Sequence, residues 1–157
     1  MGLSEEQMGI VQMQMATIGY IMANYKKFGD EALKVANEYF YELSKSMGQN
    51  IKTKMGITGT DANAVAAVMN AFLGQAAGMK GIIRVEGNKV IAETAAFCPN
   101  MEAVKMMKAP WETVCKNYSW PSFLGLAAGV NPKVTMEVPE SRIYGKNRCF
   151  HVVTVPK

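Results

Sequence analysis

The hydrophobic period of this chain first changes near Gly81, and the change limits the folds open to it. Before Gly81, apolar residues recur every three or four positions, as they do along one face of a helix. After it, the ranges 82–94 and 133–155 contain segments that alternate with a period of two, which is typical of strands with one buried face. We therefore expect an α+β protein, with a helical part at 1–80 and a sheet-containing part at 81–157.

Three helices are expected in the helical N-terminal half. Ser4 and Gln7 have the spacing of a capping box at the start of the first helix. Gly29 suits its end, and Asp30 is predicted as the N-cap of the second helix. Thr60 or Asp61 is predicted to cap the third.

Two hairpins are expected in the sheet-containing part, with short helices between them. Glu86-Gly87-Asn88 predicts a tight turn inside the first hairpin, and a loop containing Gly145 joins the strands of the second. The intervening residues predict helical pieces over 101–107, from near Pro110, and over 123–128. At 157 residues, the chain is long enough for one domain, so we expect a single four-stranded antiparallel sheet with helices on one face.

Composition argues against several classes of partner. The net charge is +4 and the lysines are scattered, so the sequence does not predict a nucleic-acid-binding surface. The longest apolar stretch, 10–23, is short and interrupted by polar residues, so we expect no membrane partner. Glu5 and Glu6 stand where a secretory signal would be basic, and three cysteines do not suit a disulfide scaffold. These observations predict a cytoplasmic protein with reduced thiols.

All three cysteines and the only histidine lie within 98–151, and three explanations are open. Cysteine is among the most buried residue types, so the first hypothesis is that the thiols are packing residues only. A second hypothesis is a zinc site, since thiolates and imidazole are preferred zinc ligands, although no C-x-x-C pair is present. Its ligands would be Cys98, Cys115, Cys149 and His151.

The third explanation is a catalytic thiol. Cys115 or Cys98 would be the nucleophile and His151 the base that activates it. Cys149 suits this pairing less well, because it stands two residues from His151 on one strand, where side chains run parallel. Aromatic residues nearby could line an apolar ligand pocket beside the cysteines: Trp111, Tyr118, Trp120 and Phe123.

A sparse set of residues resembles a known family. The set comprises Phe28-Gly29-Asp30-Glu31-Ala32, Cys98-Pro99, Glu102-Ala103, Cys115, Gly129-Val130-Asn131-Pro132, Glu137, Gly145 and Cys149-Phe150. It resembles the L-2-amino-thiazoline-4-carboxylate hydrolase family over roughly 28–155. More distantly, the C-terminal part is similar to ligand-binding domains of the 4-vinyl reductase type.

The two resemblances imply different functions. The first implies a hydrolase that opens a cyclic amidine, but the acidic residue expected shortly after Cys115 is replaced by Lys116-Asn117-Tyr118-Ser119-Trp120. The second implies a non-catalytic domain that binds a hydrophobic small molecule, with zinc as a cofactor in some members. A third hypothesis is an interaction protein that forms a homodimer through its N-terminal helix.

Overall fold

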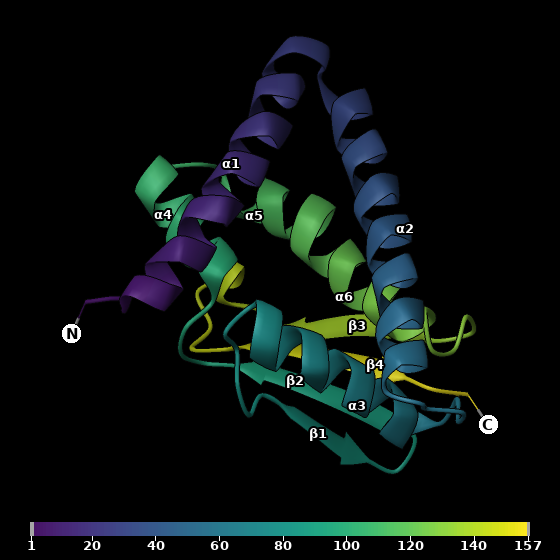
Figure 1. Ribbon diagram of the computed structural model, residues 1–157. Coiled ribbons are helices and arrows are strands. Elements are labelled where there is room, and N and C mark those ends of the chain that lie inside the picture. The colour runs from purple at the N-terminus through teal and green to yellow at the C-terminus, as the bar shows by residue number, and fades with distance from the viewer. Residues whose placement is uncertain (1, 157) are drawn as a thin grey trace.

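The computed structural model describes residues 2–156, in which a helical hairpin stands over a small sheet (Figure 1). The hairpin is formed by α1 (Glu5–Phe28) and α2 (Asp30–Lys54), which meet at Gly29 and diverge toward the sheet. α3 (Ala62–Ala71) continues into the π-helical segment η1 (Phe72–Ala76). None of the helices within 2–156 is long and apolar enough to cross a membrane.

The helix caps agree with the sequence at two of three positions. Ser4 Oγ accepts from the Gln7 N–H at 3.1 Å and Gln7 Oε1 accepts from the Ser4 N–H at 3.0 Å, so the capping box is confirmed. Asp61 Oδ1 accepts from the Ala64 N–H at 2.9 Å and caps α3. The prediction for Asp30 is wrong, because Gly29, with φ of 66°, ends α1 and also precedes α2 directly. A turn of one glycine leaves Asp30 as the first helical residue.

The sheet has four antiparallel strands in the order β1-β2-β4-β3. Gly87, at φ of 62°, makes the tight turn of the first hairpin, as its sequence predicts. The two hairpins join where β2 pairs with β4. The α+β class and the four-stranded sheet are confirmed, and the strands are β1 (Ile83–Glu86), β2 (Lys89–Thr94), β3 (Thr135–Glu140) and β4 (Cys149–Thr154).

The helices between the hairpins are longer and more continuous than expected. α4 spans Pro99–Met107, and α5 (Trp111–Val114) runs through the π-helical segment η2 (Cys115–Ser119) into α6 (Trp120–Ala128). The π segment is followed closely by Pro121. Proline has no backbone N–H, so it cannot donate a hydrogen bond to a carbonyl of the preceding turn. The Lys116 carbonyl in that turn accepts instead from Asn37 Nδ2 of α2 at 3.0 Å.

Glycines let α2 and α6 pack with their backbones in close approach. A Cβ placed at Gly48 would overlap the Leu126 carbonyl, and one at Gly125 would overlap the Tyr41 carbonyl. At Gly129, an added Cβ would overlap the Lys45 carbonyl. α6 is therefore held firmly between α2 and the inner face of the sheet, in a core that includes Leu126 and Val153.

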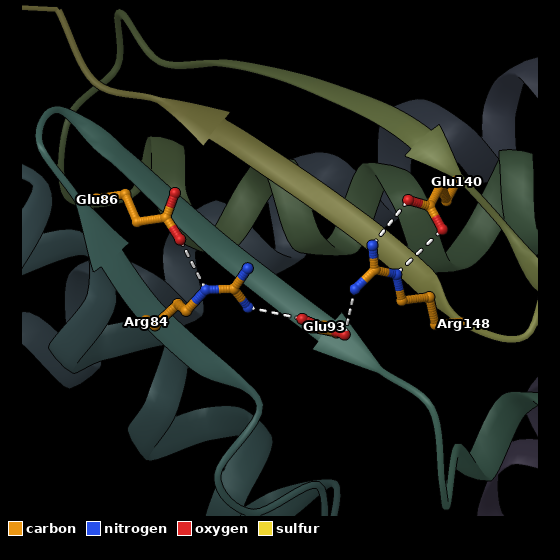
Figure 2. Close-up of polar contacts among 5 residues, drawn as sticks. All are labelled: Arg84, Glu86, Glu93, Glu140 and Arg148. Carbon is orange, nitrogen blue, oxygen red and sulfur yellow. Dashed lines mark hydrogen bonds and ion pairs between the residues drawn. The ribbon is translucent and has the colours of Figure 1, made fainter.

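The outer face of the sheet carries a chain of ion pairs (Figure 2). Arg84 contacts Glu86 and Glu93, at 2.9 Å and 2.7 Å. Arg148 contacts the other oxygen of Glu93 at 2.6 Å and also pairs with Glu140 at 2.8 Å. The helices lie on the opposite side of the sheet in this view, and the core cluster takes Val90, Ala92 and Val153 from that inner face.

Candidate functional site

A cavity of about 330 Å³ lies between the helices and the inner face of the sheet. Its size is within the range of small-molecule sites in proteins. All three cysteines and His151 line it. The full lining is Met13, Gln14, Thr17, Phe40, Leu43, Ser44, Met47, Phe72, Leu73, Ala77, Met79, Thr94, Cys98, Pro99, Asn100, Cys115, Tyr118, Ser119, Trp120, Ser122, Phe123, Leu126, Cys149 and His151.

Both π-helical segments contribute to this cavity. η1 supplies Phe72 and Leu73, and η2 supplies Cys115, Tyr118 and Ser119. A π segment inserts one extra residue into a helical turn and is found frequently at functional sites. Here the two widened turns help to form the cavity wall.

His151 lies deep in the cavity, on the inner face of β4. Its imidazole stacks on the Phe123 ring, with centroids 4.4 Å apart and an interplanar angle of 15°. The residue is only 5% exposed, and burial lowers the pKa of its side chain to about 4. The imidazole is therefore neutral at pH 7, with one nitrogen able to donate and the other able to accept.

Four buried polar atoms of cavity-lining residues have no hydrogen-bond partner in the described chain. They are both ring nitrogens of His151, Thr94 Oγ1 and Asn100 Oδ1. Thr94 is 3% exposed and pairs with Cys149 across β2 and β4, so it shares the inner face with His151. Buried polar groups in folded proteins nearly always have partners. Their concentration around one cavity leaves its wall with hydrogen-bonding atoms that the described chain does not satisfy.

No side chain of Asp, Glu, Lys or Arg is among the described residues that line the cavity. Its polar groups are hydroxyls, amides, thiols and the neutral imidazole. An ion entering the cavity would lose its hydration without gaining a charged partner, which is strongly unfavourable. Burial of a charged group against this lining is therefore unfavourable.

Two of the three thiols, those of Cys98 and Cys115, lie in surroundings that keep them protonated. Burial raises the pKa of Cys98, and it raises the pKa of Cys115 to about 12. Cys149 Sγ accepts from the Arg142 N–H at 3.3 Å. A nucleophilic cysteine normally has a lowered pKa, so the surroundings of Cys98 and Cys115 do not favour either as a catalytic thiol.

A metal site also lacks support from the geometry. Within residues 2–156, no group of three or more His, Cys, Asp or Glu side chains is arranged to hold a metal ion. The cysteines and His151 line the same cavity without forming a coordination sphere. The zinc hypothesis stays a prediction from the sequence.

Three of the four predicted aromatic residues line the cavity. Tyr118, Trp120 and Phe123 do so, and the Tyr118 hydroxyl is hydrogen-bonded to Gln14 Oε1 of α1. Trp111 does not, because α5 directs it into a second apolar cluster that includes Val11 of α1. Sequence reasoning missed Thr94 and Asn100. Side chains alternate along a strand, so Thr94 could have been predicted to point inward on the same face as Val90.

Comparisons with protein-family models, with curated proteins and with solved structures find no match to this chain. The resemblance to the amino-thiazoline hydrolases thus rests on the quoted residues alone. The chemistry of the cavity has to be argued from its own side chains.

Proposed function

We propose that this protein binds a neutral, largely apolar small molecule in the cavity between α1, α2, α6 and the sheet. The observation that carries the proposal is the set of four unpartnered polar atoms, all on residues that line an uncharged cavity. The three free cysteines favour action in the reducing cytoplasm.

The side chains define the chemistry of the ligand. Asn100 Oδ1 can only accept, so the ligand must offer a hydrogen-bond donor. His151 and Thr94 can each donate or accept, so they suit a hydroxyl, carbonyl or amide on the same molecule. Aromatic and aliphatic side chains form most of the remaining wall. A ring system with one polar, uncharged substituent satisfies both requirements.

The hydrolase suggested by the family resemblance stays a hypothesis. It would need a base to activate water or a thiol, and His151 with its lowered pKa is a weak base. No carboxylate is found among the described lining residues to replace it. Turnover of a cyclic amidine by the purified protein, abolished in Cys115→Ala, would support the hydrolase over simple binding.

Three probes of equal ring size test the binding proposal: naphthol, naphthalene and naphthoate. We expect naphthol to bind about 10-fold more tightly than naphthalene, because it satisfies a buried polar group. Naphthoate should bind about 100-fold more weakly than naphthol, since the lining offers its charge no partner. Isothermal titration calorimetry gives the three affinities.

Two variants locate the binding site. Ser122→Phe places a ring in the cavity and should abolish binding, whereas Ser46→Phe makes the same change on the exposed surface of α2 and should not. Thr94→Val should reduce the preference for naphthol over naphthalene while leaving naphthalene binding intact. Equal affinity for naphthol and naphthoate, or binding unchanged in Ser122→Phe, would contradict the proposal.

A further inference from the structure

The helical hairpin carries most of the exposed large apolar side chains of the molecule. Of nine such residues in the described chain, six lie on α1 and α2 and are between 41% and 74% exposed. Five of them line a groove of about 930 Å³ between the two helices, here termed the hairpin groove. The six residues are Met13, Tyr20, Phe28, Val35, Tyr39 and Leu43.

The hairpin groove is continuous with the ligand cavity. Thr17, Phe40 and Leu43 line both. Met13 of α1, 71% exposed, also lines the cavity. The cavity therefore borders the groove, and we take its mouth to lie at these shared residues, so that a molecule covering the groove also covers the mouth.

We propose that a second copy of this chain packs its α1–α2 hairpin into the hairpin groove and closes the mouth of the ligand cavity. The cavity part of this inference rests on the proposed binding function. The contact would be isologous, with each copy presenting the same helices to the other about a twofold axis.

The exposed area is sufficient for a stable dimer. At about 200 Å² for a large side chain, the six residues present about 700 Å² per copy. A standard protein interface buries about 800 Å² per partner.

The charges permit self-association. Among the described groove-lining residues, Glu31 is the only charged one, and it is paired with Lys34 at 2.6 Å. Two identical surfaces of this kind meet without opposing like charges. The hairpin also projects beyond the other helices at its Gly29 end, so a partner can reach both helices (Figure 1).

The first test is the oligomeric state. We expect the wild-type chain to sediment as a dimer at about 10 µM, a concentration at which interfaces of this size are occupied. Val35→Glu buries a charge in the interface and should raise the dissociation constant at least about 100-fold. Val35 lines the groove only, so the cavity itself is unchanged. Met106→Glu is the control, because it makes the same kind of change at an exposed apolar residue of α4, outside the groove.

The second test measures closure without a ligand. Cys115 lies inside the cavity, so its alkylation by N-ethylmaleimide, followed by mass spectrometry of the peptide, reports access through the mouth. We expect alkylation about 10-fold faster in monomeric Val35→Glu than in the dimeric wild type and Met106→Glu. Release of the neutral dye Nile red should accelerate in parallel.

Each outcome supports or overturns one part of the proposal. A wild-type chain that is monomeric at about 100 µM, or a Val35→Glu variant that remains dimeric, overturns the interface. A monomer with unchanged Cys115 access overturns the closure. Absence of Nile red binding in both states, with dimerisation and Cys115 protection as expected, contradicts the proposed binding function while supporting the interface.

Discussion

The imidazole of His151 lies flat against the phenyl ring of Phe123, with centroids 4.4 Å apart and planes inclined by 15°. The contact joins β4 to α6 across the inner face of the sheet. A neutral imidazole tolerates this position, whereas a charged one would be buried without any anionic partner among the described cavity residues. The stacked pair thus couples the protonation state of one residue to the stability of the cavity wall.

The first prediction concerns acid stability. The pKa of His151 is about 4 in the folded protein against 6.5 as the ordinary value, so the unfolded chain binds the proton first as pH falls. The contribution of His151 to the free energy of unfolding is complete above pH 6.5 and is lost as the pH falls to 4. At pH 4 the loss amounts to about 3 kcal/mol.

His151→Leu isolates this contribution. The leucine cannot bind a proton, so the variant should lose less free energy of unfolding than the wild type between pH 6.5 and pH 4. At pH 7 the substitution should leave the free energy of unfolding unchanged or raise it. Urea unfolding at several pH values measures the difference. Parallel pH profiles for the two proteins would contradict a buried, neutral His151.

The second prediction concerns Cys115. With a pKa of about 12, its thiolate fraction is very small near neutral pH, so alkylation by iodoacetamide should be slow. The rate should rise about 10-fold per pH unit between about pH 7 and pH 10 without a plateau. In denaturant, the alkylation rate of the same cysteine should reach a plateau at a pH near the pKa of an ordinary thiol. A plateau below about pH 8 in the folded protein would instead indicate an activated nucleophile.

The third prediction concerns the contact between α2 and α6. Gly125→Ala forces a methyl group against the Tyr41 carbonyl and should destabilise the fold by about 1–3 kcal/mol or more. Gly9→Ala is the matched control, because a Cβ at Gly9 on α1 meets nothing within 4 Å. It should stabilise the protein by about 0.5–1 kcal/mol. Denaturant midpoints give both values, and equal effects would contradict the close approach of the helices.

The fourth prediction concerns the outer face of the sheet. Arg148 and Arg84 hold the pKa of Glu93 below its ordinary value through hydrogen bonds. The stability that the ionised Glu93 contributes is present above the ordinary carboxyl pKa. It is lost as the pH falls through the lowered pKa that Glu93 has in the folded protein. Glu93→Gln removes both ion pairs, so it should lower the melting temperature slightly at low salt and less at high salt. A large, salt-independent loss would indicate a packing role instead.

The class of fold could be predicted because it depends on local patterns. The period of two placed Cys149 and His151 on one face of a strand, and the structure has both on the inner face of β4. The turn at Gly87 and the cap at Ser4 follow from residue chemistry within a few positions. These features need no knowledge of distant parts of the chain.

The site was only partly predictable because it depends on how distant elements meet. Trp111 is a large aromatic residue of the kind that often lines a pocket, but the direction of α5 turns it toward α1. Thr94 is a common strand residue, and only the absence of a buried partner distinguishes it. The π-helical turn at Cys115 involves Pro121 and Asn37, which are far apart in the sequence.

The glycine contacts between α2 and α6 have a mechanical consequence. With backbones touching at Gly48, Gly125 and Gly129, α2 cannot shift against α6 without steric overlap. Within the described residues, α1 has no such backbone contact with α6 and is held by side chains instead, among them Val11 and Ile18, which are fully buried against residues of α4 and α5. The part of the cavity wall that α2 and α6 form is therefore rigid, and any change in the width of the cavity needs movement of elements other than this pair.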